Sequence, residues 1–431
     1  MSARFDVRAY REPRPQPWLI HLLGPVNKAW MLHGALRLVS LELPPADRAR
    51  LRAAVNPATA AFLGPNHPEF TTDWLIDKEI SRLCSPLMAH WASYEIVNGS
   101  PASQAFWRAN NLVANAPGGD GKAYSVRWAR RGHGVLLHPE GTATWQGERT
   151  SPLLPGIIEM AWETAHQVRE AGESRRVFVV PLVWRLCFTA DATPGLLREM
   201  ALIERELALP AGPEGSGPGE RFAALMRATL RRQCERLGLP APEGADYFAD
   251  QAAAMSAIRA RLTERYGEVD ADMTRAQHRL RGAIRRLASS SGDEAGAKRD
   301  RALVTELQRL HSFDPLLYDR PSLTQEQVAE NLKRVRSALV TRGWKNALHN
   351  LVPVAVAPRV AHVRVPEPLD VGAAEAACAT AANPADVEAA RAALLVELRA
   401  RLQAGLDSLG REVSALVDAR RMTNPLHSAR S

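Results

Sequence analysis

The segment AAFLGPNHPEFTTD, residues 60–73, joins a short apolar run to a Gly-Pro turn, and a helical pattern (Trp74–Met88) follows it. The apolar run favours a buried strand, so the turn marks a strand-to-helix junction. Such junctions bring side chains to the open edge of an α/β sheet, where ligands bind. His67 and Asp73 fall at this junction, and the sequence therefore predicts a functional edge here.

The pattern that starts at residues 60–73, a short apolar run followed by a helical segment, recurs along the next hundred residues. Further strand-like runs lie at Gly134–Leu137 and Val177–Leu182, and a helical pattern at Gly156–Ala171 stands between them. Strands that alternate with helices predict an α/β fold with a central sheet. The last of these runs contains Pro181, which indicates an edge or irregular strand.

Changes in composition divide the chain into four segments. We expect a polar tail with an apolar helix striped over 26–43, an α/β core, an Arg/Ala/Leu-rich helical insertion, and a return to strand before a final helix. The corresponding ranges are 1–50, 51–190, 191–350 and 351–431, with returning strands at Val354–Ala357 and Val360–Val365 and the last helix at about Ala385–Arg420.

Composition limits the classes of protein that fit. The 431 residues are 46% hydrophobic, which excludes disorder over the whole length, and no span reaches the roughly 20 apolar residues that cross a bilayer. The net charge is +8, but 49 of the 55 basic residues are arginine, a skew typical of genomic base composition. The Arg-rich stretches 255–287 and 331–342 lack interleaved aromatics, so we expect solvated helix faces there.

The N-terminal apolar helix and the cysteines each bear on location. The helix either packs on the core or lies in the headgroup layer of a membrane, and the sequence leaves both open. The four cysteines are far apart and form no C-x-x-C pair. A disulfide framework and a zinc site are therefore not expected, and a reducing compartment fits.

Two short motifs carry chemistry. A histidine near an aspartate, as with His67 and Asp73, is the minimum set for general-base catalysis, because the carboxylate fixes the imidazole tautomer. The segment GVLLHPEGT, residues 134–142, ends a strand in a turn with a carboxylate, a flexible backbone and a hydroxyl. Each motif alone is more often an ordinary capped turn or strand end than a functional site. The other histidines, His138 among them, show no ligand spacing and are expected in the core or at the surface.

In this order the motifs resemble the glycerolipid acyltransferase superfamily, which includes the lysophosphatidic acid and glycerol-3-phosphate acyltransferases. That family shows N-H-x-x-x-x-D after a strand, then F-P-E-G-T-R-S, a helix, a strand of the type V-P-V and a closing strand V-x-F-G-E-P. The matching stretches are NHPEFTTD (66–73), LLHPEGTAT (136–144), LLPGII (153–158), VFVVPLVW (177–184) and AHVRVPEPLDV (361–371).

The resemblance implies an acyltransferase-like sheet flanked by helices, with a large helical insertion and a C-terminal helix. It implies transfer of a fatty acyl group from acyl-CoA or acyl carrier protein to a hydroxyl, with no metal or redox cofactor and no covalent enzyme intermediate. His67 is then the general base and Asp73 its orienting partner. Asn66, Glu140, Gly141 and Thr142 are the expected substrate-binding residues.

The same resemblance implies partners and a location. We expect an acyl thioester donor, a lipid or small-molecule acceptor and peripheral membrane contact, but no nucleic acid. The expected location is cytoplasmic, at the inner face of a membrane. Two alternatives remain: a non-catalytic homologue that binds lipid or acts as a scaffold, and a basic helical protein that binds nucleic acid or an anionic membrane.

The sequence departs from the family pattern at two places. Five residues instead of four separate His67 from Asp73, so the pair meets only if a loop absorbs the extra residue, and Asp77 is the alternative partner. Ala143 stands where the family has an arginine, and the segment NLVAN (111–115) lacks a second one. Because arginines grip phosphate, the expected acceptor extends beyond phosphate-bearing lipids. Candidates for substitute arginines are Arg127, Arg130, Arg131 and Arg149.

Overall fold

The computed structural model describes residues 6–212, 215–242, 244, 246–340, 343–344, 348–349, 355–379 and 383–427. The chain forms two compact units. Unit 1 comprises Met1–Ala143, Gly147–Leu186 and Val360–Glu412, and unit 2 comprises Thr144–Gln146, Cys187–Arg359 and Val413–Ser431.

The four expected segments map onto these units unevenly. The expected insertion over 191–350 falls in unit 2, and the first segment, 1–50, belongs to unit 1 together with most of the expected α/β core, 51–190. The last segment, 351–431, is divided between the two units. Predictions for residues 1–5, 351–354 and 380–382 lie outside the described residues.

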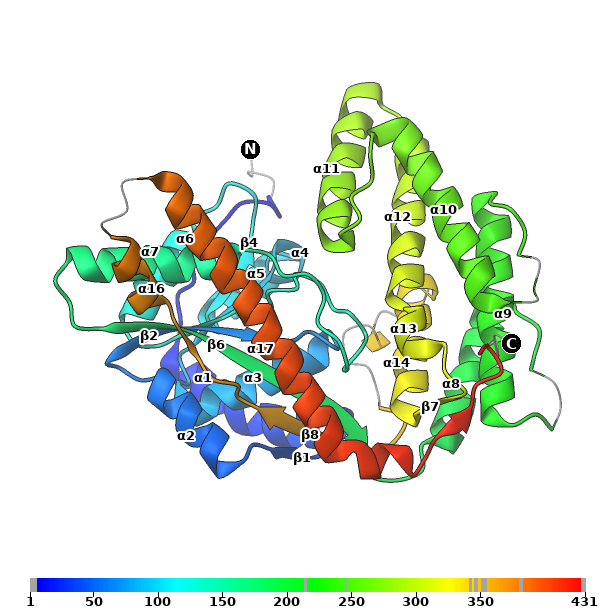
Figure 1. Ribbon diagram of the computed structural model, residues 1–431, viewed down its shortest axis with the longest axis horizontal. Helices are drawn as coiled ribbons and strands as arrows, with labels where there is room; N and C mark the ends of the chain where they lie inside the picture. The colour runs from blue at the N-terminus through cyan, green and yellow to red at the C-terminus, as the bar shows by residue number, and fades with distance from the viewer. Residues whose placement is uncertain are drawn as a thin grey trace. The chain divides into compact units, whose positions relative to one another are not determined.

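A mostly parallel sheet flanked by helices forms unit 1, which confirms the α/β class (Figure 1). β2 pairs in parallel with both β5 and β6, and β3 pairs in parallel with β4 and β5. The strand order is β1 (Leu38–Glu42), β8 (Arg359–Arg364), β6 (Arg176–Phe188), β2 (Thr59–Pro65), β5 (Val135–Leu136), β3 (Ala89–Ser93) and β4 (Leu112–Asn115), with β9 (Leu369–Asp370) antiparallel to β6.

Helices cover both faces of this sheet (Figure 1). Every residue of β2 is buried, as expected of a parallel strand with layers on both sides. Ala60 and Phe62 alternate toward a core shared with α6, α7 and α17. The helices of unit 1 are α1 (Pro17–Val26), α2 (Pro45–Ala54), α3 (Thr71–Cys84), α4 (Tyr94–Val97), α5 (Pro101–Ala109), α6 (Gly121–Arg130), α7 (Gly156–Glu170), α16 (Val371–Cys378) and most of α17 (Pro384–Asp418), plus a π-helical segment, η1 (Asn27–Ala35).

The chain returns to the first sheet after unit 2, as the strand-like tract near residue 360 predicts. β8 and β9 belong to the same sheet as β5, and α17 closely matches the helix expected over 385–420. The expected strand at Val354–Ala357 is wrong for residues 355–357, which belong to no strand, and Val354 lies outside the described residues.

The helix expected over 26–43 is wrong in its second half. The chain is helical from Pro17 to Ala35, turns at Arg37 with a φ of 52°, and then forms β1. The strand forms because β8, more than 300 residues later, pairs with it. The local pattern of apolar residues carries no information about this distant strand. No helix in the described part of the chain has the length and apolar character that crossing a bilayer requires.

Pro181 does not mark an edge strand, contrary to expectation. β6 lies inside the sheet between β8 and β2, and its register with β2 runs without a break from Thr59↔Arg176 to Pro65↔Leu182. Proline removes one N–H donor only, so the remaining residues of a 13-residue strand hold the pairing.

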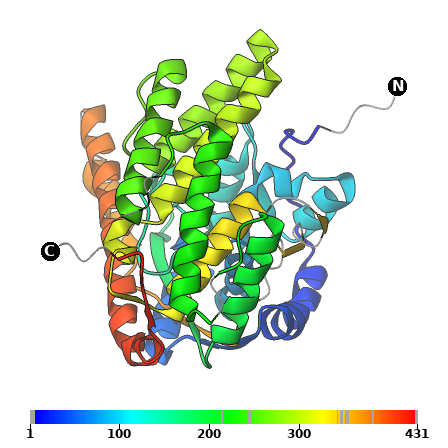
Figure 2. The same cartoon turned by 90° about the vertical axis from the view of Figure 1, so that its right-hand side faces the viewer.

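Unit 2 is a helical block, in which α12 contacts α9, α10, α11 and α14 (Figure 2). Its core is apolar and contains Phe222, Phe248 and Phe313. The helices with described bounds in this unit are α8 (Thr193–Glu206), α9 (Pro218–Leu237), α10 (Tyr247–Tyr266), α11 (Met273–Ser291), α12 (Glu294–Ser312), α13 (Pro315–Tyr318) and α14 (Gln325–Leu339), and the short strands β7 (Ser322–Leu323) and β10 (Met422–Thr423) pair with each other.

The solvated face expected over 331–342 is wrong for α14. Arg334 and Arg336 are buried, and the guanidinium of Arg336 pairs with the carboxylate of Glu199 at 2.7 Å. The guanidinium of Arg334 donates to the carbonyl of Trp145 at 2.7 Å. These acceptors offset the cost of burying the two charged guanidinium groups. They come from distant parts of unit 2, so the sequence of the helix alone does not predict the burial.

Candidate active site

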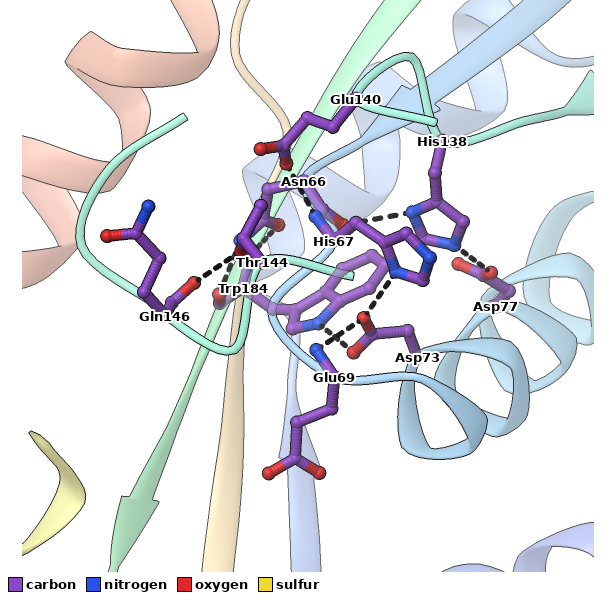
Figure 3. Close-up of polar contacts among 10 residues, drawn as sticks. All are labelled: Asn66, His67, Glu69, Asp73, Asp77, His138, Glu140, Thr144, Gln146 and Trp184. Carbon is purple, nitrogen blue, oxygen red and sulfur yellow. Dashed lines mark hydrogen bonds and ion pairs between the residues drawn. The ribbon is translucent and has the colours of Figure 1, made fainter. Parts of the chain in front are cut away.

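Two parallel strands bring the two motifs to one edge of the sheet. β2 and β5 are neighbours with Leu63 opposite Leu136, so the segments that follow them leave the sheet side by side. The backbone N–H of His67 donates to Oε1 of Glu140 at 2.8 Å across this edge (Figure 3). The carboxyl end of a parallel sheet is where the sequence predicts the site, and the two motifs meet there.

His67 and Asp73 meet despite their stretched spacing. Nδ1 of His67 lies 2.8 Å from Oδ2 of Asp73 (Figure 3). The helix α3 begins only at Thr71, so the loop before it absorbs the extra residue. Asp77, the alternative partner, instead lies against His138.

The carboxylate of Asp73 is held in place from three sides. Its Oδ2 also accepts the backbone N–H of Glu69 at 2.7 Å, and its Oδ1 accepts the indole N–H of Trp184 at 3.1 Å. The side chain is fully buried in the first turn of α3, where the helix dipole favours negative charge. An acceptor at Nδ1 fixes the proton of His67 on that nitrogen, and Nε2 is then the basic atom.

The local electrostatics favour a neutral His67. Burial, reinforced by the nearby His138, lowers the pKa of His67 well below its ordinary value. Burial and the charges of Glu69 and Asp77 raise the pKa of Asp73, against the N–H groups that favour its ionised form. A neutral imidazole at pH 7 can accept a proton, which is the state that general-base catalysis requires.

Glu140 fastens two loops at this edge. Its Oε1 accepts the N–H of His67, and its Oε2 accepts the N–H of Ser151 at 2.7 Å, in the loop before α7. The side chain is buried, and burial raises its pKa. Gly141 follows with a φ of 71°, a conformation that favours glycine, and Thr142 is half-buried in the same turn. A contact of these residues with substrate stays a prediction.

We expect Glu140→Gln to destabilise the protein by about 2 kcal/mol or more, because its amide NH₂ faces a backbone N–H where an oxygen is needed. Chemical denaturation measures this free energy of unfolding. Glu163→Gln on the exposed face of α7 is the matched control and should change it little. Equal stability of the two variants would contradict the role of Glu140 in joining the loops.

Asn66 extends the pairing of β2 with β6 by one residue. Its side-chain oxygen accepts the N–H of Trp184 at 3.0 Å, and its NH₂ donates to the carbonyl of Trp184 at 3.1 Å. The residue is buried, so these contacts set the height of the His67 loop above the sheet. Its predicted part in substrate binding stays a prediction.

Sequence reasoning missed three contributors to this site: His138, Trp184 and the task of Asp77. The ring of His138 stacks on that of His67 with centroids 3.9 Å apart and planes 14° apart. One signal was present, since Asp73 and Asp77 are four residues apart and therefore share one face of α3. No local signal points to Trp184, which reaches Asp73 from a strand 111 residues later.

Two of the four arginines that could replace the missing phosphate-binding arginines pair with carboxylates instead. The guanidinium of Arg127 pairs with Glu12, and that of Arg130 pairs with Glu173. Within the described residues, no group of three or more His, Cys, Asp or Glu side chains is placed to hold a metal ion.

Comparison with known proteins leaves the family open. No protein-family model matches the chain, and no curated protein matches it either.

Proposed function

We propose that this protein is an acyltransferase that uses His67 as a general base oriented by Asp73. The observation that supports it most is the His67–Asp73 contact of 2.8 Å at the carboxyl edge of the parallel sheet, beside the Glu140 loop. The order of motifs that resembles the glycerolipid acyltransferases supports the same class and the corresponding fold.

The chemistry needs one base and no covalent enzyme intermediate. Nε2 of His67 takes the proton of an acceptor hydroxyl while its oxygen attacks the thioester carbonyl of acyl-CoA or acyl carrier protein. The tetrahedral intermediate then collapses, the C–S bond breaks, and the thiolate takes the proton back from the imidazolium. Asp73 stabilises the imidazolium that exists between these two transfers.

The acceptor is a lipid or small molecule with a hydroxyl group, and phosphate is not required of it. Ala143 has no side chain to grip phosphate, and Arg127 and Arg130 are engaged by carboxylates. An acceptor alcohol without phosphate therefore fits the proposal as well as a lysophospholipid does.

Incubation of the purified protein with acyl thioesters and a panel of acceptors tests the proposal. The panel contains glycerol-3-phosphate, lysophosphatidic acid, a neutral lysophospholipid, a monoacylglycerol and a simple amine. Mass spectrometry should find one acylated product formed together with an equal amount of free thiol. An intact thioester with every acceptor would contradict the proposal and favour a non-catalytic lipid-binding protein.

A stripe of exposed apolar side chains supports peripheral membrane contact. Trp18, Leu22, Val26 and Trp30 recur every four residues, and the two tryptophans are 66% and 78% exposed. Four residues are slightly more than one turn of the α-helix α1 and slightly less than one turn of the wider π-helix η1. The two deviations have opposite sign, so the four side chains stay on one side of the helical segment. Residues 17–37 contain no Asp or Glu. This segment therefore suits the interface of an anionic membrane.

The double variant Trp18→Ser/Trp30→Ser should bind vesicles containing anionic lipid at least about tenfold more weakly, because each tryptophan buries a large apolar area on insertion. Sedimentation with the vesicles measures the bound fraction. Trp344→Ser, at a tryptophan that is 73% exposed, is the matched control and should bind as the wild type does. Unchanged binding by the double variant would exclude the stripe as the membrane contact.

A further inference from the structure

The ring of His138 lies between two oxygen atoms. Its Nδ1 is 3.0 Å from the backbone carbonyl oxygen of Asn66, and its Nε2 is 3.0 Å from Oδ2 of Asp77 (Figure 3). A carbonyl oxygen only accepts hydrogen bonds, so Nδ1 carries a proton. When Asp77 is ionised, Nε2 must carry one too, and the ring is then an imidazolium.

This ring also faces the proposed base directly. The His67 and His138 rings are nearly parallel and in van der Waals contact, with centroids 3.9 Å apart. The two nitrogens of His138 are occupied by Asn66 and Asp77, so His138 has no atom left to exchange protons with a substrate. Any effect of His138 on catalysis must therefore pass through His67.

We propose that His138 is a positively charged positioning residue that keeps the imidazole of His67 neutral. A charge at this distance disfavours a second charge on the stacked ring. Asp77 holds the charge on His138, and the backbone of Asn66 fixes the ring plane above His67. The site thus contains two histidine–aspartate pairs with different tasks: one supplies the base, and the other controls its protonation.

Most of the groups that surround His138 favour this charge, against burial, which raises the pKa of Asp77. Burial lowers the pKa of His138, but the charge and hydrogen bond of Asp77, the Asn66 carbonyl and Glu140 together raise it above its ordinary value. Asp73 on α3 contributes a further carboxylate on the side of His67.

Two basic groups complete these surroundings. Burial lowers the pKa of His90 on β3 well below its ordinary value, so this ring is neutral and adds no competing charge. Lys78 on α3 donates to the carbonyl of Asn110, and burial lowers its pKa to about 7. Because Lys78 titrates close to neutrality, the comparison between variants must cover the range above and below that value.

The consequence for catalysis rests on the proposed function. A neutral His67 is ready to take the acceptor proton at pH 7 without first losing one of its own. Once it has done so, two imidazolium rings face each other, and their repulsion favours rapid return of the proton to the leaving thiolate. His138 therefore keeps the base unprotonated before the reaction and favours the second half of the acyl transfer, in which the proton leaves His67, without contacting the substrate.

Histidine-selective ¹⁵N NMR of the full chain tests this without any substrate. In the wild type, both ring nitrogens of His138 should be protonated at pH 7, whereas His67 should carry a proton on Nδ1 only. His138→Phe keeps a stacked ring but removes the charge, and His138→Gln removes the charge and keeps one hydrogen bond. Both variants should raise the pKa of His67 by about one to three units, the range expected for loss of a unit charge near 4 Å.

His133→Phe is the matched control, because His133 is a half-buried histidine of the same unit whose ring stacks on Trp128 instead. It should leave the pKa of His67 unchanged. An unprotonated Nε2 on His138 at pH 7 places the shared proton on Asp77 and overturns the proposal. An unchanged His67 pKa in both His138 variants does the same.

The NMR result and the acylation result fail independently. A raised His67 pKa without acyl transfer by the wild type would uphold the charge on His138 and overturn the proposed function. Acyl transfer by the wild type, together with a His67 pKa that is unchanged in the His138 variants, would uphold the function and overturn this inference.

Discussion

Replacement of His67 by glutamine should lower the turnover of acyl transfer by about 10²- to 10⁴-fold, the contribution of a positioned general base. Glutamine has no basic atom, so the acceptor hydroxyl must lose its proton to water. The substrate-binding parts of the site remain, so the acceptor KM should change much less than kcat. Turnover is measured from the thiol released under saturating donor and acceptor.

The loss is attributable to the base only if the fold persists. In His67→Gln the carboxylate of Asp73 keeps two donors, the N–H of Glu69 and the indole of Trp184. His133→Gln makes the same substitution at a histidine that stacks on Trp128 and should turn over as the wild type does. Wild-type turnover by His67→Gln would remove His67 from the mechanism.

Replacement of Asp73 by asparagine should reduce both turnover and stability. The two oxygens of Asp73 accept three N–H groups, and an asparagine NH₂ in place of either oxygen faces a donor. Leaving a buried donor without an acceptor costs about 1–3 kcal/mol. Without the carboxylate, His67 also loses the partner that fixes its tautomer and stabilises the imidazolium, so turnover should fall by about 10²- to 10⁴-fold.

Asp386→Asn is the matched control, because Asp386 also lies in the first turn of a helix of unit 1, α17, but is exposed. Its unfolding free energy and turnover should stay close to those of the wild type. If Asp73→Asn behaved like this control, the His67–Asp73 contact would contribute neither to turnover nor to the free energy of unfolding.

The junction around His67 could be predicted because its causes are local. Residues 60–88 contain all the signals for this junction: a buried apolar strand, a Gly-Pro turn and a following helix. The meeting of the two motifs follows from the same logic, since parallel strands direct their carboxyl ends to one edge. The hydrogen bond between His67 and Glu140 is what that expectation requires.

The parts that could not be predicted depend on partners far away in the sequence. β1 is a strand because β8 pairs with it, and Pro181 is tolerated inside the sheet because its neighbours in β6 hold the register. Trp184 completes the shell of Asp73 from that same strand. His138 lacked ligand spacing in the sequence, yet the adjacency of β2 and β5 places its ring on that of His67.

The most direct test of the central claim relates turnover to the protonation of His67 itself. The measurement is the pH dependence of kcat/KM for acyl transfer, compared with the pKa of His67 from NMR of the same protein. Burial lowers that pKa, so the rate should hold as pH falls through the ordinary histidine value of about 6.5 and then decline as His67 becomes protonated. A rate that passes unchanged through the titration of His67 would contradict the claim that this imidazole is the base.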